Sequence, residues 1–211
     1  MSRYAQLAYT PRVRAVQHEM GSGHAAGRRL AVPAEGPDPL TGNEAAFITG
    51  LDGFLIATAG ETGWPYVQFR GGPPGFVHVL DATTIGFADV GGNRQYITTG
   101  NLRGSAKAAL FFIDHARRTR LKLYGHAFAV PVDQAPEKHV RQVSSTRTEG
   151  RVERLVTVEV EGWDWNCPRH ITPRFSESEL AAALSPVRAR LADLEEENTA
   201  LRAELAALRG E

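Results

Sequence analysis

About seven short segments rich in β-branched and aromatic residues follow one another between residues 54 and 162. Clusters of Gly, Asp, Asn and Pro separate them, as expected between strands. A parallel sheet needs long helical crossovers, and the intervals here are too short to hold them. The spacing therefore predicts a mainly β fold, a barrel or sandwich with peripheral helices. The expected strands are 54–60, 66–70, 76–80, 84–90, 108–114, 121–130 and 154–162.

The residues on either side of the strands divide the chain into three parts. Residues 1–42 are predicted to contain an N-terminal helix, followed over 21–42 by an irregular connection rich in Gly and Pro. Residues 43–175 form the predicted β domain. Residues 176–211 are predicted to be helical.

Two helix-start signals support these limits. Pro11 suits the first position of a helix that begins after Thr10. Thr41 followed by Glu44 fits a capping box, in which each residue satisfies a backbone N–H of the other. We therefore expect a short helix at the entrance to the β domain.

The C-terminal segment carries a heptad repeat. Ser176 and Glu179 form a capping box for a short helix, and Ser185-Pro186 suits the N-cap and first position of a second helix. Apolar residues then recur in steps of four and three, which is typical of a coiled-coil seam. The a positions are Leu191, Asn198 and Leu205, and the d positions are Val187, Leu194, Leu201 and Leu208.

The charges that flank this seam favour a parallel dimer with a second copy of the chain. A single Asn at an a position pairs best with its own copy, which fixes the register at a cost in stability. A helix folded back on its own core is the alternative, but it has no need of matched flanking charges. In a parallel partner the pairs are Arg190 with Glu195, Glu197 with Arg202, and Glu204 with Arg209.

Composition excludes several classes of protein. Lys and Arg number 24, as do Asp and Glu, so no net charge predicts nucleic acid or an anionic membrane as a partner. No segment has the apolar length of a signal-peptide core or a membrane span. A single cysteine, Cys167, excludes an intramolecular disulfide. A cytoplasmic protein is the simplest interpretation.

Arginines and glycines gather where two expected strands end. Arg70 ends one strand, and after the next hairpin Gly91-Gly92 leads into Asn93-Arg94-Gln95 at a helix start. Arginine matches phosphate oxygens bidentately, and a Gly turn lets backbone N–H groups approach an anion. Arg70, Arg94 and Gln95, with Asn93 at the turn, are therefore candidates for a phosphate cradle.

Flavin mononucleotide (FMN) needs such a cradle and also hydrogen-bonding groups along the polar edge of its ring. Gln68, Asp89 and the backbone at Phe69 and Ala88 are candidates for that edge. Arg120, on a later strand, is a candidate for contact with the ring. Taken singly, such arginines and Gly turns are more often structural, and it is their spacing that favours a cofactor site.

Three blocks resemble the pyridoxamine 5′-phosphate oxidase-like family of split β-barrel flavoproteins: GWPYVQFRGGPPGF, GFADVGGNRQY and WDWNCPRHITPRF. The resemblance covers roughly residues 43–175. It implies an FMN-binding split β-barrel and a homodimer with two flavin sites lined by both chains. It also implies that Arg120 lies near the flavin, and that Trp165 and Arg174 of the partner subunit close the site.

The chain departs from the oxidases of that family. Pro65 stands where they have a basic residue, Gln95 where they have a lysine, and His170-Ile171-Thr172 where they have an Arg-x-His pair. The resemblance therefore implies an FMN-dependent oxidoreductase with a small-molecule substrate or a nicotinamide electron donor, but not pyridoxamine phosphate oxidation. No catalytic group is assigned.

Other interpretations stay open. They are a flavin-binding carrier or redox sensor without turnover, a cofactor-free dimeric scaffold, and a split-barrel relative that binds the deazaflavin F420. Cys167 and His170 have a spacing that suits a metal, but one pair lacks the further ligands of a structural zinc site, so no metal is expected.

Overall fold

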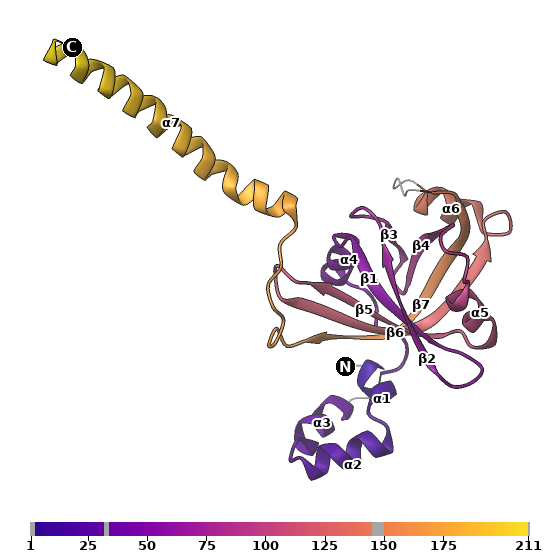
Figure 1. The fold of residues 1–211 in the computed structure, drawn as a ribbon. Helices are drawn as coiled ribbons and strands as arrows, with labels where there is room; N and C mark the ends of the chain where they lie inside the picture. Colours follow the sequence, from indigo (N-terminus) through magenta and orange to yellow (C-terminus); the bar gives the residue numbers. More distant parts are fainter. Residues whose placement is uncertain (1–2, 32–33, 145–149, 211) are drawn as a thin grey trace. The chain divides into compact units, whose positions relative to one another are not determined.

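The computed structural model describes residues 3–31, 34–144 and 150–210 (Figure 1). It divides into two compact units. The larger contains Met1–Asp114 and Arg118–Ile171, and the smaller contains His115–Arg117 and Thr172–Glu211. The described strands belong to the larger unit, and the long C-terminal helix belongs to the smaller one.

Seven antiparallel strands form one sheet in the order β2-β1-β5-β6-β7-β4-β3. Each strand overlaps one of the segments expected from the sequence, with bounds that differ by a few residues, so the prediction of a mainly β fold is confirmed. Buried and less buried residues alternate along β5, as the two-residue period of a strand requires. The strands are β1 (Gly53–Ala59), β2 (Pro65–Gly71), β3 (Val77–Asp81), β4 (Thr84–Val90), β5 (Lys107–Asp114), β6 (Thr119–Pro131) and β7 (Val152–Asn166).

The sheet is rolled into a barrel around an aromatic core. In a flat sheet, β1 and β4 would lie about 19 Å apart, because neighbouring strands are spaced by about 4.8 Å. Instead, the ring centroids of Phe54 on β1 and Phe87 on β4 are 5.3 Å apart. Phe54 also stacks on Phe112 of β5, with centroids 4.9 Å apart. The predicted split β-barrel is thereby confirmed.

Helix α4 (Gly42–Thr49) closes part of this core. It begins at the predicted capping box, where the backbone N–H of Thr41 donates to Glu44 Oε2 at 3.1 Å. Ile48 is fully buried in the aromatic core, and Phe47 packs against it. Helix α5 (Ile97–Gly104) follows β4, and Leu102 joins the same core.

A second, smaller apolar cluster lies beside β4. Helix α6 (Glu137–Val143) contributes Val143, which packs with Ala88 of β4 and Leu155 of β7. The sequence analysis predicted no helix in this region, so α6 is an additional element.

The N-terminal helices differ in part from the prediction. Helix α2 (Pro11–Glu19) begins after Thr10 as expected, but α3 (Gly23–Leu30) occupies part of the segment predicted to be irregular. Gly23 and Gly27 look like helix breakers, yet Gly costs only about 1 kcal/mol in a helix. Tertiary contact outweighs this cost, because Ala26 is buried and α3 contacts α1 (Arg3–Ala8) and α2.

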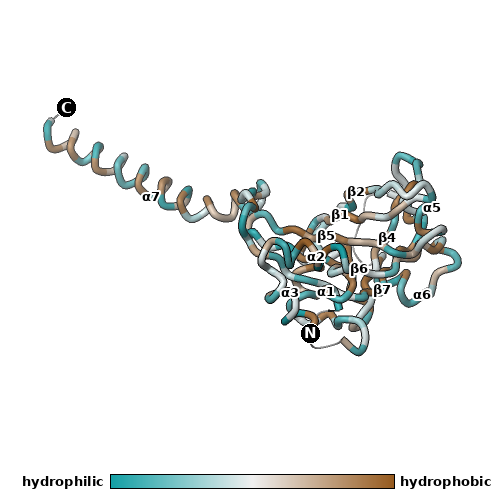
Figure 2. Tube along the Cα trace, turned by 90° about the horizontal axis from the view of Figure 1, so that it is seen from below, coloured by the Kyte–Doolittle hydropathy of each residue, from teal (hydrophilic) through white to brown (hydrophobic). Residues whose placement is uncertain are grey.

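Helix α7 (Glu177–Arg209) corrects a second expectation. The predicted capping box at Ser176 and Glu179 is present, but the helix runs without a break through Pro186. Proline removes one backbone hydrogen bond, and the flanking Ala, Leu and Arg residues favour helix strongly enough to continue past it. None of the described residues of α7 is buried within the chain. Apolar and polar residues alternate along it (Figure 2).

Candidate functional site

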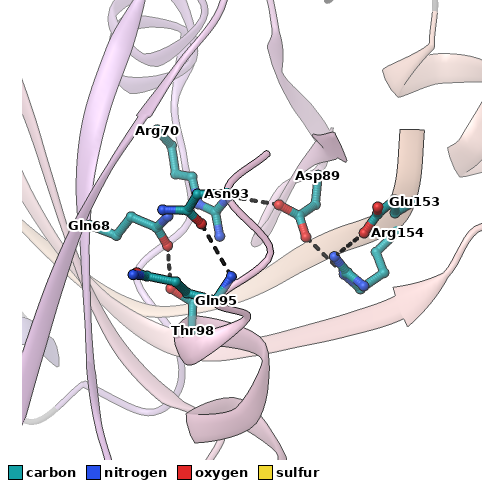
Figure 3. A network of polar contacts seen from close by, with 8 residues as sticks. All are labelled: Gln68, Arg70, Asp89, Asn93, Gln95, Thr98, Glu153 and Arg154. Carbon is teal, nitrogen blue, oxygen red and sulfur yellow. Dashed lines mark hydrogen bonds and ion pairs between the residues drawn. The ribbon is translucent and has the colours of Figure 1, made fainter. Parts of the chain in front are cut away.

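A polar hollow of about 230 Å³ lies where β2, β4, the start of α5 and β7 meet. Its walls are strand-end side chains, and its rim is the loop that follows β4. Figure 3 shows the polar network that lines it. The lining residues are Tyr66, Gln68, Arg70, Asp89, Val90, Gly92, Asn93, Arg94, Gln95, Tyr96, Ile97, Thr98, Thr99 and Arg154.

Asp89 stands at the back of this hollow between two arginines. Arg70 Nη1 donates to Asp89 Oδ1 at 2.7 Å, and Arg154 Nε donates to Asp89 Oδ2 at 2.8 Å. Asp89 is only 4% exposed, so its charge needs these partners. The Arg70 pair joins β2 to β4 across the rolled sheet. The Arg154 pair joins residues that lie directly opposite each other on β4 and β7.

Arg154 is held on three sides. Besides Asp89, its Nη2 donates to Glu153 Oε2 at 2.6 Å, and its guanidinium lies 4.8 Å from the centroid of the Tyr96 ring. Burial alone would lower the pKa of Arg154, but the bonds to Asp89 and Glu153 outweigh it and raise the pKa. The guanidinium is therefore a fixed cation.

The loop between β4 and α5 has a backbone suited to an anion. Arg94 and Tyr96 have left-handed φ angles of 62° and 52°, which are costly for residues other than Gly. Asn93 Oδ1 accepts from the backbone N–H of Gln95 at 3.3 Å and holds the turn. A Cβ at Gly92 would meet no described atom within 4 Å, so the loop is open on that side.

The N-terminus of α5 faces the same hollow. Its N-cap residue, Tyr96, makes no side-chain capping bond in the described structure. The backbone N–H groups of the first turn, on Ile97, Thr98 and Thr99, are thus left for another acceptor. The helix dipole adds positive potential at this end.

Gln68 is oriented by a neighbour from α5. Thr98 Oγ1 donates to Gln68 Oε1 at 2.6 Å. The oxygen of the amide is thereby used, and its Nε2 is the remaining donor. Gln68 and Arg70 point the same way from β2, as the alternation along that strand predicts.

The structure brings together six of the predicted site residues and not the others. Gln68, Arg70, Asp89, Asn93, Arg94 and Gln95 line the hollow. Phe69, Ala88, Arg120, Trp165 and Arg174 do not.

Phe69 and Ala88 have other surroundings. Phe69 points out of the barrel and is 65% exposed; its ring lies over Gly53, where a Cβ would be 2.4 Å from Phe69 Cζ. Ala88 is buried in the cluster with Val143 and Leu155. Neither side chain lines the hollow, and only the backbone of these two residues is left for the predicted contact with a ring edge.

Arg120 and Trp165 have other partners within the larger unit. Arg120 faces the side-chain amide of Asn166 across the β6–β7 pair. Trp165 packs edge-on against Phe47, with centroids 4.8 Å apart. Arg174 belongs to the smaller compact unit. The resemblance assigns Trp165 and Arg174 to the partner subunit's contribution, which stays a prediction.

Sequence inspection missed Arg154, Tyr96, Thr98 and Thr99. Thr98 and Thr99 lie within four residues after Gln95, at the helix start that the sequence already indicates. Arg154 carries no comparable signal, because it lies 65 residues from Asp89 and the register of β4 against β7 cannot be read from either strand alone.

The charge of the lining residues indicates the kind of ligand. Three arginines and one aspartate give the hollow a net charge of +2, which matches a phosphate monoester of about −2. Arg70 Nε is buried and has no hydrogen-bond partner among the described residues. Buried donors of this kind are uncommon, and a bound ligand is one explanation for them. The charge of this end of the hollow fits a phosphate group.

The chain is thus a small antiparallel β-barrel protein with a cationic hollow at one end of its strands. The chain belongs to the pyridoxamine 5′-phosphate oxidase family, whose model matches residues 40–164. This match confirms the family resemblance; it covers the first two sequence blocks and ends at the start of the third.

Solved structures with similar folds share little sequence with it. HupZ of Group A Streptococcus is 13% identical, with a TM-score of 0.49, and the match covers 64% of this chain and 100% of that one. A putative pyridoxamine 5′-phosphate oxidase from Lactobacillus delbrueckii is 17% identical (TM-score 0.46; 60% and 94% covered). An FMN-binding protein from Syntrophomonas wolfei is 12% identical (TM-score 0.44; 74% and 97% covered). No curated protein is similar enough to match.

Two further features bear on the site. Within residues 3–31, 34–144 and 150–210, no three His, Cys, Asp or Glu side chains are grouped so that they would hold a metal ion. In the same described ranges, no helix combines the length and the apolar character needed to cross a bilayer.

Proposed function

We propose that this chain is an FMN-binding oxidoreductase that acts as a homodimer. The observation that carries the proposal is the hollow at the start of α5, where a net charge of +2, a buried Arg70 Nε without a partner and an uncapped helix N-terminus coincide. Each of these features favours a phosphate. The family and the spacing of the predicted cradle favour FMN as the molecule that carries it.

The residues of the hollow then have distinct roles. Arg70 and Arg94 pair with phosphate oxygens, and the N–H groups of the first turn of α5 complete the cradle. Gln68 Nε2 donates toward the polar part of the cofactor. Bound FMN supplies the chemistry of hydride acceptance and electron transfer. The chain supplies orientation and a positive environment.

A second copy completes the apolar part of the site. The hollow itself is polar, whereas the flavin ring needs apolar walls. Trp64, Val67 and Phe69 lie on or beside β2 at the sheet edge, and all three are exposed in the single chain. A partner that covers this face would bring its own residues, such as Trp165 and Arg174, toward the ring.

The electron donor is proposed to be a reduced nicotinamide or a small organic substrate. Pyridoxamine phosphate oxidation is not proposed, because Pro65, Gln95 and His170-Ile171-Thr172 replace the family's basic residue, lysine and Arg-x-His pair. We expect the protein to act in the cytoplasm.

Titration of the purified chain with FMN tests the cofactor. Arg94→Ala is expected to weaken binding about tenfold or more, since a hydrogen bond to a charged group contributes about 1.5–3 kcal/mol. Arg141→Ala is the matched control, because Arg141 is exposed and pairs with Glu137 on α6. A protein that does not quench FMN fluorescence would refute the proposal, and saturation by F420 alone would assign the site to the deazaflavin.

Anaerobic mixing with NADH or NADPH tests the oxidoreductase. Bleaching of the bound flavin is expected if one of these nucleotides is the donor. Bound FMN that neither nucleotide reduces, but that dithionite does reduce, would favour a flavin-binding redox sensor. The coiled-coil seam is the feature that favours this second candidate.

The dimer is also proposed to include a parallel coiled coil of α7. Because the helix is continuous through Pro186, the heptad register extends toward its start, with Leu184 at a and Leu180 at d. Pro186 falls at c, outside the seam. Both leucines are exposed in the single chain, as are the later apolar seam residues. A second copy would bury all of them.

Disulfide cross-linking tests the register. In a Cys167→Ser background, Leu205→Cys at an a position is expected to form an interchain disulfide, because equivalent a residues meet in a parallel, in-register dimer. Glu196→Cys at the outer f position is the control and is expected not to cross-link. A chain that is monomeric by light scattering, or equal cross-linking of both variants, would refute the coiled coil.

A further inference from the structure

We infer that Arg154 is a positioning residue for the phosphate end of the flavin site, acting through Asp89 on Arg70. This inference rests on the proposed FMN site and adds to it a residue from another strand. Arg154 lies on β7, whereas the predicted cradle is built from β2 and the loop after β4.

The geometry is that of one carboxylate shared by two guanidinium groups. Arg70 Nη1 lies 2.7 Å from Asp89 Oδ1, and Arg154 Nε lies 2.8 Å from Asp89 Oδ2. Each arginine therefore takes one oxygen. Because Arg154 fills Oδ2, Arg70 binds Asp89 through Nη1 alone and keeps its Nε for another acceptor, which is the buried atom without a partner.

Removing Arg154 would leave one oxygen of Asp89 without its arginine partner. Asp89 is buried, and a buried carboxylate that loses one of two cations attracts the other more strongly. The planar fork of Arg70 can bind both oxygens of a carboxylate. We therefore expect Arg70 to take both oxygens of Asp89 and to turn its free donors away from the ligand.

Arg154 also stabilises the loop that bears Arg94. Its guanidinium lies over the Tyr96 ring at 4.8 Å, and Tyr96 is the left-handed residue at the start of α5. The same side chain thus fixes the orientation of Arg70 and the backbone next to Arg94. The orientation of Arg70 and the backbone next to Arg94 both affect binding of the FMN phosphate, and neither affects binding of the flavin ring.

Comparison of FMN with riboflavin provides the test, because riboflavin has the same ring and lacks the phosphate. We expect Arg154→Met to weaken FMN binding about tenfold or more and riboflavin binding less than about twofold. In an Arg70→Met background, the further loss of FMN affinity on Arg154→Met should fall to about threefold or less, since residues that act through one another are not additive.

Two results would overturn the inference. Equal weakening of FMN and riboflavin would make Arg154 a general structural residue, and additive losses with Arg70→Met would make it an independent phosphate contact. A wild-type chain that binds neither flavin would instead refute the proposed function itself, so the two failures are distinguishable.

A second variant keeps the test informative if Arg154→Met does not fold. Arg154→Lys keeps the positive charge but has a single nitrogen in place of the planar fork that bonds to Asp89 and Glu153 through separate nitrogens. We expect its preference for FMN over riboflavin to fall about three- to tenfold with an unchanged circular dichroism spectrum. An unchanged preference in a folded Arg154→Lys protein would overturn the inference.

Discussion

The indole Nε1 of Trp165 donates a hydrogen bond to Glu44 Oε1 at 2.7 Å. Glu44 is the capping-box residue of α4, and its other oxygen accepts from the backbone N–H of Thr41. One carboxylate, only 3% exposed, thus caps a helix and ties it to the last strand of the barrel. Burial alone would raise the pKa of Glu44, but the bonds from Thr41 and Trp165 outweigh it and lower the pKa.

Glu44→Gln is therefore expected to destabilise the fold. A neutral amide accepts these bonds less strongly, and its NH₂ group would face donors, so we expect a loss of about 1.5–3 kcal/mol in the free energy of unfolding. Urea denaturation at pH 7 measures it. Glu137→Gln on α6 is the control, because the Glu137 side chain is 81% exposed, and its effect should stay within about 0.5 kcal/mol.

The effect of Glu44 should also depend on pH. Its pKa is lowered from the ordinary value of 4.5, so its ionised form stabilises the folded state. This contribution is fully present above pH 4.5 and is lost as the pH falls through the lowered pKa of the folded state. The difference between wild type and Glu44→Gln should therefore shrink below pH 4.5, and a difference that grew on acidification would contradict this account.

Gly162→Ala should detach α1 from the barrel. A Cβ at Gly162 would lie 2.4 Å from the backbone nitrogen of Tyr4, where no side chain fits. We expect a destabilisation of about 1–3 kcal/mol, together with faster proteolysis of the N-terminal helices. Gly27→Ala on α3 is the matched control, because its Cβ would meet no described atom within 4 Å and a helical alanine should be neutral or stabilising. Equal protease resistance of the two variants would contradict the prediction.

Arg94→Gly should separate stability from ligand binding. Arg94 has a φ of 62°, which glycine adopts without the penalty of a Cβ. The flavin-free protein is expected to gain up to about 1 kcal/mol of stability while its FMN affinity falls. Arg94→Ala removes the same guanidinium but keeps the strain, so it should lose affinity without gaining stability. Thermal unfolding without flavin checks this, and a lower midpoint for Arg94→Gly than for Arg94→Ala would contradict it.

Asn198→Leu tests the polar position in the proposed seam. Replacing a buried Asn pair by leucine should raise the thermal stability of the coiled coil and loosen its choice of register and number of chains. Light scattering and denaturation of the full chain measure both properties. A variant that stays a single dimeric species with unchanged stability would show that Asn198 does not lie at an interface between copies.

Much of the barrel was predictable because its signals are local. The strands are segments rich in β-branched and aromatic residues, and the capping boxes at Thr41 and Ser176 are four-residue patterns; all are present. The failures at α3 and Pro186 have a common reason, since Gly and Pro were interpreted as breaks. In both places, tertiary contact or the propensity of the flanking residues outweighed a local cost of about 1–3 kcal/mol.

The candidate site also contains both residues that the sequence predicts and a residue that it does not. Arg70, Asn93, Arg94 and Gln95 stand at strand ends and a Gly turn, and such positions can be recognised along the chain. Arg154 could not be found, because its partnership with Asp89 depends on the β4–β7 register. The sequence alone thus determined the strands, the turn chemistry and the heptad pattern, all of which depend on neighbours within a few residues. Only the tertiary structure decided which strand ends meet, because rolling the sheet sets contacts between residues that lie far apart in the chain.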